Sequence, residues 1–169
     1  MRSRRVVTPQ GSRPAAVHIR SGRVIGVLDF DNVPSDCRLD DAADAAIVPG
    51  LVDTHVHTQA PGWSPEQGFQ ATTRAAAAGG VTTIIEEPLD GNPPTTSVAA
   101  LEARRRAAEG RCFVDVGFWG GAVPGNEREL GPLVKAGVFG FKCSLIASRG
   151  SAFQPVTEAE LGVIMPGLT

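Results

Sequence analysis

Residues 50–57 read Gly-Leu-Val-Asp-Thr-His-Val-His, a short apolar and β-branched run that ends in two histidines. This composition predicts a β-strand. Residues 64–67 read Ser-Pro-Glu-Gln, which places a capping Ser, a Pro at the first helical position and a Gln three residues after the cap. We expect a helix from here to Ala78, so this stretch predicts one strand–loop–helix unit.

The same unit recurs along the rest of the chain. Short β-branched and aromatic runs predict further strands at 81–85, 112–118 and 138–143. Helices are expected from a cap at Thr96 or Ser97 to Gly110, from Asn126 to Ala136, and from a capping box at Thr157 and Glu160. Strands separated by helices are typical of parallel βα units, in either an open doubly wound sheet or a barrel.

The chain length limits the barrel alternative. A closed (β/α)₈ barrel takes about 250 residues, whereas this chain has 169. A barrel therefore requires the chain to be an N-terminal portion, and the sequence ends inside the last predicted helix.

The pattern before residue 47 is different. Residues 16–20 and 23–28 alternate on either side of a Ser21-Gly22 turn, which predicts a small antiparallel β element. Residues 29–46 are polar, and the composition then changes sharply. We place a domain boundary near residue 47.

Composition excludes several classes of function. Sixteen Lys and Arg against eighteen Asp and Glu give a net charge of -2, so no basic footprint for nucleic acid exists. The basic residues 1–5 are not followed by the apolar core of a secretory leader, so we expect none, and no apolar run approaches the roughly 18 residues of a membrane span. We therefore expect a cytoplasmic protein with no membrane partner. The three cysteines form no CxxC pair, so we expect buried or incidental thiols.

The pair His55 and His57 is the main candidate for chemistry. Side chains at i and i+2 of a strand share one face, so the two imidazoles can converge on one metal ion. The carboxyl end of a parallel strand is also where α/β proteins build active sites. Two unrelated surface histidines are the alternative. We expect His18, far upstream, to be a surface or packing residue.

Several of these segments resemble one enzyme family. Residues 48–57, followed by Pro61-Gly62 and by residues 77–83, are similar to the opening of the cyclic amidohydrolases, which include allantoinases, hydantoinases (dihydropyrimidinases) and dihydroorotases. The allantoinase-like segments are 93–96, 116–126 and 136–143. The resemblance implies an α/β fold: part of a small β-sandwich at 1–47, then the first half of a metal-dependent (β/α)₈ TIM barrel at 48–169.

The resemblance also implies a site and a reaction. It makes His55 and His57 ligands of the first of two metal ions, usually zinc, and Lys142 a carbamylated bridge between both ions. A metal-activated hydroxide would then attack a ring amide carbonyl. For an allantoinase, this opens the hydantoin ring of allantoin, a cyclic ureide of purine catabolism, to allantoate. Full-length relatives are expected to be homo-oligomers.

Two features set the chain apart from the family pattern. Where similar proteins commonly have Asp-Met-Pro after the second strand, this chain has Glu86-Glu87-Pro88, which adds negative charge near the expected pocket. A neutral hydantoin tolerates that charge better than the anionic dihydroorotate would. The family pattern also needs two more histidines and an aspartate on later strands, and no histidine follows His57.

Three functions follow as hypotheses. The first is an allantoinase-like hydrolase, of which this chain alone is inactive. The second is a hydantoinase-like hydrolase. The third is a non-catalytic product of a truncated gene.

Overall fold

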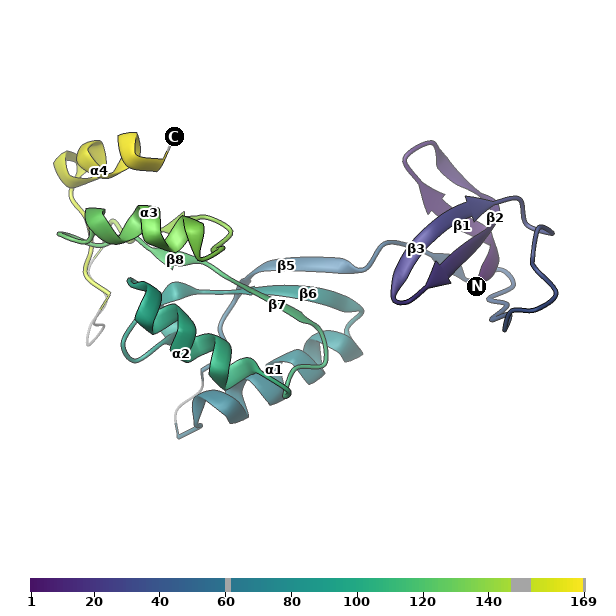
Figure 1. Ribbon diagram of the computed structural model, residues 1–169, viewed down its shortest axis with the longest axis horizontal. Coiled ribbons are helices and arrows are strands. Elements are labelled where there is room, and N and C mark those ends of the chain that lie inside the picture. The colour runs from purple at the N-terminus through teal and green to yellow at the C-terminus, as the bar shows by residue number, and fades with distance from the viewer. Residues whose placement is uncertain (60–61, 147–152, 169) are drawn as a thin grey trace. The chain divides into compact units, whose positions relative to one another are not determined.

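The computed structural model describes residues 1–59, 62–146 and 153–168. Pro61, part of the motif after the histidine pair, lies outside the described residues. The chain forms two compact units, Met1–Pro49 and Gly50–Thr169. Figure 1 colours them along the chain, from purple for the first unit to yellow at the end of the second. In the described ranges, no helix is long and apolar enough to cross a membrane.

The first unit is a four-stranded sheet in the order β3-β2-β1-β4. Its strands are β1 Arg2–Thr8, β2 Gly11–Arg20, β3 Arg23–Leu28 and β4 Ala46–Ile47. The first three are antiparallel neighbours, and β4 runs parallel to β1. A small apolar cluster of Val6, Ala15 and Val17, with Ile47 against it, forms its core.

The predicted antiparallel hairpin is confirmed, with Arg20 paired to Arg23 across the turn. Ser21 and Gly22 both have positive φ, at 50° and 73°, as a two-residue turn between right-twisted strands requires. Strand β1 was not predicted separately, because arginines interrupt its apolar alternation. Buried Val6 shows that one face of this strand still contributes to the core.

The second unit alternates strands and helices. In chain order it contains β5 Leu51–Val56, α1 Pro65–Ala78, β6 Val81–Glu86, α2 Val98–Ala108, β7 Asp115–Phe118, β8 Gly120–Gly121, α3 Glu127–Lys135, β9 Phe141–Lys142 and α4 Glu158–Ile164. Short 3-10 turns occupy Pro88–Asp90 and Met165–Leu168. Strands β5-β6-β7 form a parallel sheet in that order, and β8 pairs with β9, also in parallel.

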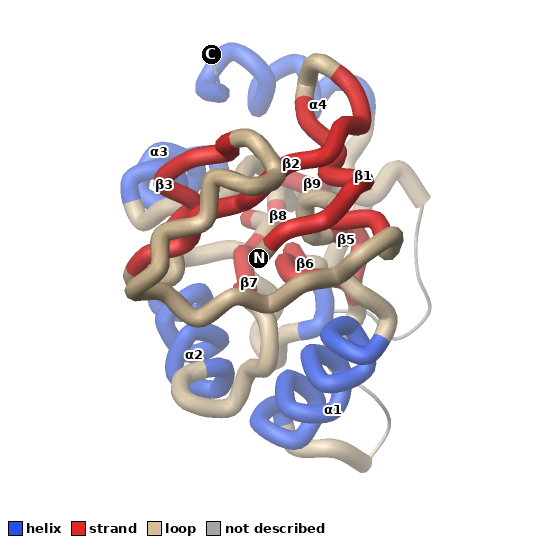
Figure 2. Tube along the Cα trace, turned by 90° about the vertical axis from the view of Figure 1, so that its right-hand side faces the viewer, coloured by secondary structure: helices blue, strands red, loops and turns tan. Residues whose placement is uncertain are grey.

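Helices α1 and α2 contact each other and lie on one side of the three-stranded sheet, as both ribbon and tube views show (Figures 1 and 2). The main core is formed by Phe69, Leu101, Ala107, Phe118 and Leu133. It joins α1, α2 and α3 to β7. Alternate residues of the strands therefore face this helical layer, and the residues between them face the opposite side.

The predicted helix starts are confirmed. Ser64 and Gln67 form a reciprocal capping box at α1, and Thr157 and Glu160 form another at α4. Between the two caps left open for α2, the structure selects Ser97, whose side chain accepts a hydrogen bond from the Ala100 amide.

Two predicted strands are shorter than expected. The strand predicted at 112–118 begins only at Asp115, and the one predicted at 138–143 is reduced to Phe141–Lys142. Gly140 interrupts the latter, with a φ of 158° and a position where a Cβ atom would come within 2.8 Å of the Trp119 ring. The segment still follows its neighbour in parallel, because the Phe139 amide donates to the Phe118 carbonyl at 3.0 Å.

The three cysteines agree with the expectation of buried or incidental thiols. All three are free, and Cys37 and Cys143 are exposed. Only Cys112 is partly buried, and this burial raises the pKa of its thiol above the usual value.

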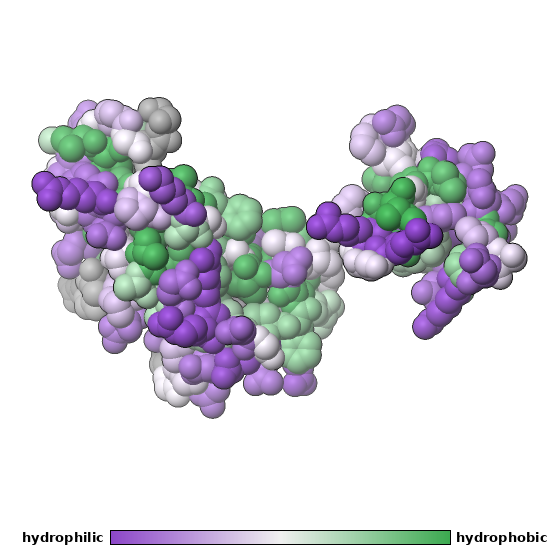
Figure 3. Space-filling view, in the orientation of Figure 1, coloured by the Kyte–Doolittle hydropathy of each residue, from purple (hydrophilic) through white to green (hydrophobic). Residues whose placement is uncertain are grey.

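Apolar side chains remain uncovered in the second unit. Leu51 and Val52 of β5, which lies at the edge of the parallel sheet, are 57% and 58% exposed. Figure 3 shows hydrophobic atoms at the surface around β5 and β6. Exposed apolar patches of this kind drive association, and an edge strand adds a template for pairing.

We therefore expect the 169-residue chain to elute from size exclusion well above its 17.6 kDa monomer mass. Replacing both exposed residues, Leu51→Lys with Val52→Lys, should shift elution toward the monomer. A wild-type chain that stays monomeric at all concentrations would show that this surface does not drive association.

Candidate metal centre

Strand alternation separates the candidate site from the core. On β5 and the residues that follow it, the side chains of Val56 and Thr58 are buried, whereas those of His55 and His57 are exposed. A period of two places these pairs on opposite faces. Both histidines therefore lie on the face that α1 and α2 leave open.

The side chains of His55, Glu87 and Lys142 meet at the carboxyl ends of β5, β6 and β9. Lys142 on β9 places its Nζ 3.3 Å from Nδ1 of His55 and forms an ion pair with Glu87. Glu87 follows β6, and its Oε1 lies 3.5 Å from the same His55 nitrogen. The Glu87 side chain is only 3% exposed, against 29% for Lys142 and 71% for His55.

The two histidines are neighbours. Their ring centroids lie 5.5 Å apart, and the ring planes meet at 72°. Two imidazoles and a carboxylate are donor types that zinc accepts, so the chemistry of this cluster fits a metal ion. However, among the residues that the structure describes, no three His, Cys, Asp or Glu side chains are arranged so that they could already hold one.

Trp119 connects the strands around this cluster. Its indole Nε1 donates to the Thr54 carbonyl of β5 at 2.8 Å, and its backbone amide donates to the Glu86 carbonyl of β6 at 3.1 Å. Lys142 Nζ lies 5.5 Å from the centre of its ring. This contact is a cation–π interaction, and it helps to hold the lysine over the strand ends.

Neither Glu87 nor Trp119 was predicted to be a site residue. The sequence did place Glu86-Glu87-Pro88 near the expected pocket, but it did not show which of the two carboxylates lies beside the histidines. Trp119 lies within an allantoinase-like segment, but its bond to β5 depends on a tertiary contact that spacing does not reveal.

A buried polar network lies on the other face of the same strand ends. Arg104 of α2 donates from Nε to Glu86 Oε2 at 3.0 Å and from Nη2 to Glu86 Oε1, which makes the ion pair bidentate. Its Nη2 also donates to Thr58 Oγ1 at 2.8 Å, and that hydroxyl donates to Glu86. The guanidinium lies 4.7 Å from the ring centre of Phe69.

Helix α1 packs against the backbone of Thr58, the residue that Arg104 contacts through its side chain. A Cβ atom at Gly68 would come within 2.0 Å of the Thr58 carbonyl oxygen. Only glycine allows this approach, which accounts for its presence inside a helix despite its low helix propensity. Thr58 is thus fixed by two contacts. Its side chain is hydrogen-bonded to Arg104 of α2, and its carbonyl packs against Gly68 of α1.

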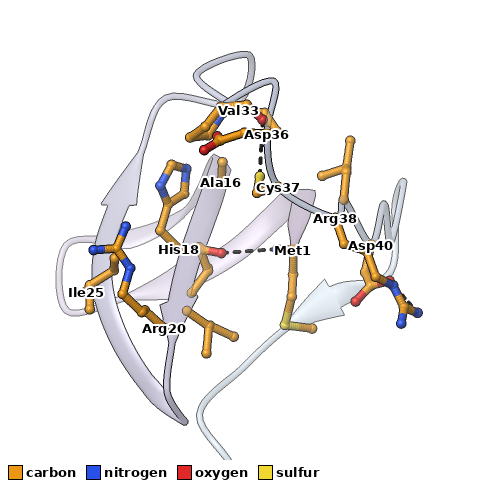
Figure 4. Close-up of a pocket in the computed structure, with 14 residues that line it drawn as sticks. Met1, Ala16, His18, Arg20, Ile25, Val33, Asp36, Cys37, Arg38 and Asp40 are labelled. Atoms are coloured by element: carbon orange, nitrogen blue, oxygen red, sulfur yellow. Dashed lines mark hydrogen bonds and ion pairs between the residues drawn. The ribbon is translucent and has the colours of Figure 1, made fainter.

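The first unit contains a separate cavity of about 520 Å³, lined by residues of β2, β3 and the segment 33–40. In Figure 4, His18, Asp36 and Cys37 lie around it. His18 Nε2 is 3.0 Å from the Asn32 carbonyl oxygen, and the Cys37 thiol donates to the Pro34 carbonyl at 3.2 Å. His18 is thus a partly buried residue of the first unit, in agreement with the expected surface or packing role.

The segment that carries the cluster also determines the family. Residues 46–155 match the model of the amidohydrolase family. The chain belongs to the amidohydrolase family. The match includes both histidines, Glu87, Trp119 and Lys142, and so contains the whole of the cluster.

Curated relatives of this amidohydrolase chain are named allantoinases. The chain is 49% identical over 162 residues to an allantoinase of Streptomyces avermitilis, covering 95% of this chain and 36% of that protein. It is 40% identical over 169 residues to a mitochondrial allantoinase of Aquarana catesbeiana, covering 99% and 35%. The chain thus spans about a third of the length of the curated relatives that it matches.

Solved structures of hydantoinases share the fold. An L-hydantoinase (dihydropyrimidinase) from Arthrobacter aurescens matches with a TM-score of 0.77 and 32% identity, over 96% of this chain and 36% of that one. A D-hydantoinase from Bacillus sp. AR9 matches with a TM-score of 0.80 at 24% identity, over 99% and 37%. The latter likeness concerns the fold alone.

Breaking the buried ion pair should be costly. We expect Arg104→Met to lower the free energy of unfolding by about 3–5 kcal/mol, because it leaves the Glu86 carboxylate buried without a counter-charge. Arg106→Met, at an exposed position of the same helix, should change it by less than about 0.5 kcal/mol. Urea unfolding followed by circular dichroism measures both. Equal stability of the two variants would mean that the pair contributes little.

Proposed function

We propose that this chain is part of an allantoinase-like hydrolase of cyclic amides. Residues 1–47 would form part of a small β-sandwich, and residues 48–169 the first half of a (β/α)₈ barrel. The observation that carries the proposal is the meeting of His55 and Lys142, with His57 beside them, at the carboxyl ends of parallel strands. This is the position at which α/β barrels build their active sites.

The metal-binding role is assigned residue by residue. His55 and His57 would bind a zinc ion through their imidazoles, and Lys142, as a carbamate, would bridge this ion to a second one. When bound, the zinc ions supply Lewis acidity and lower the pKa of water. Lys142 now contacts Glu87, so in this account it exchanges that partner for the metal ions.

The chain's own residues supply position and polarity. Glu87 and Trp119 keep the Lys142 amine at the strand ends, next to His55. The buried carboxylate of Glu87 gives this side of the pocket negative charge. A neutral cyclic ureide therefore suits the pocket better than an anionic ring does.

The names of the relatives favour allantoin as the substrate. A hydantoin-type ring is the second candidate, because a hydantoinase structure at 32% identity superposes on 96% of this chain. The chain spans about a third of these relatives, and it holds three of the proposed ligands. In this proposal, the remaining ligands and the proton-shuttling aspartate belong to the part of the relatives that this chain does not cover, so the chain alone does not turn over substrate.

The metal assignment predicts one weak zinc site in the 169-residue chain. Two imidazoles alone bind zinc far less tightly than a closed set of three or four ligands does. Isothermal titration should give one equivalent that is lost in His55→Ala and in His57→Ala. His18→Ala is the matched control and should bind as the wild type does. Binding that survives His57→Ala would place the ligands elsewhere.

The catalytic assignment is tested by supplying the remainder of the protein. The chain is co-expressed with the part of the Streptomyces avermitilis allantoinase that it does not cover. We expect zinc-dependent conversion of allantoin to allantoate that His57→Ala abolishes. Conversion of hydantoin but not allantoin would favour the second candidate. A well-formed complex without either activity would indicate a non-catalytic chain.

A further inference from the structure

We propose that Thr58, Glu86 and Arg104 form a positioning network for the metal-binding side chains. The inference rests on the proposed metal site, since positioning matters only if these side chains bind an ion. It adds three residues that touch neither metal nor substrate and that act through their neighbours in the chain.

Each strand-end member of the network adjoins a residue of the candidate site. Thr58 directly follows His57, and Glu86 directly precedes Glu87. Because successive side chains of an extended segment point to opposite faces, fixing residues 58 and 86 on the helix side orients residues 57 and 87 on the open side. One guanidinium thus sets the positions of two site residues.

Strand pairing alone leaves these residues less constrained. The register between β5 and β6 shifts between Asp53 and Val56, so the ladder is irregular where His55 lies. Only one pair, Val56 with Glu86, follows this irregularity, and it is the last pair of the ladder. The hydrogen bonds of Arg104 to Glu86 and to Thr58 connect the ends of β6 and β5 at this pair and just beyond it.

Stability alone does not account for a charged network here. A buried ion pair can often be replaced by apolar side chains of similar volume with no loss of stability, so its presence is weak support for a purely stabilising role. Its fixed bidentate geometry instead restricts how the two strand ends lie against α2. Removing a hydrogen bond that orients a metal ligand without touching the metal usually lowers metal affinity by about 10–100-fold.

The first test removes the link to β5 with minimal disturbance. Thr58→Val deletes the hydroxyl but leaves the Glu86–Arg104 ion pair intact. Thr73→Val is the matched control, because Thr73 is also buried and its hydroxyl donates to the Phe69 carbonyl, away from the site. We expect Thr58→Val to weaken Co²⁺ binding at least tenfold and to change the cobalt absorption spectrum, whereas Thr73→Val changes neither.

A second variant removes both charges together. Arg104→Met with Glu86→Leu leaves no unpaired buried charge, so it should fold even if either single variant does not. We expect a cooperative unfolding transition near that of the wild type, together with the same loss of Co²⁺ affinity. Wild-type affinity and spectrum in both this variant and Thr58→Val would overturn the inference.

A metal-free readout separates this inference from the proposed function. Side-chain NMR of ¹³C-labelled histidine reports the rotamer averaging of His57, with His18 as the internal reference. We expect increased averaging at His57 in Thr58→Val and none at His18. If the wild-type chain binds no Co²⁺, the metal assignment fails. If the His57 ring is equally ordered in all variants, the positioning role fails, whether or not metal binds.

Discussion

The buried ion pair between Glu86 and Arg104 is the interaction on which the arrangement of the strand ends in the second unit depends. It joins the end of β6 to α2, and through Thr58 it also fixes the residue that follows β5 and His57. None of its buried side-chain nitrogen or oxygen atoms lacks a hydrogen-bond partner, as burial beside an apolar core requires. Phe69 packs against the guanidinium, so the network is continuous with the hydrophobic core of α1, α2 and β7.

The open face of the same strands carries the proposed metal-binding residues. Parallel pairing aligns the carboxyl ends of β5, β6 and β7 in one sheet, and the contacts of Lys142 with His55 and Glu87 bring β9, which pairs with β8, to the same place. His55, Glu87 and Lys142 meet there, and Trp119 ties β5 to β6 beside them. The candidate site and the core thus lie on opposite faces of the same strands, because side chains alternate between the two faces along each strand.

Local signals in the sequence predicted much of this architecture. The capping boxes at Ser64 and Thr157, the Ser21-Gly22 turn and the strand–helix alternation depend on neighbours in sequence, and the structure confirms them. Contacts between distant segments were not predictable in this way. The pairing of Glu87 with Lys142 joins residues 55 positions apart, and the close approach of the Trp119 ring to Gly140 likewise joins separate segments. The ligand roles of His55, His57 and Lys142 stay a prediction.

The central claim is that one zinc ion binds at the carboxyl ends of these strands. A crystal of the zinc-loaded chain, measured at the zinc absorption edge, tests this most directly. The account predicts an anomalous peak about 2.0–2.1 Å from an imidazole nitrogen of both His55 and His57, on the face opposite Arg104. A peak bound to other residues, or no peak beside this histidine pair, would contradict it.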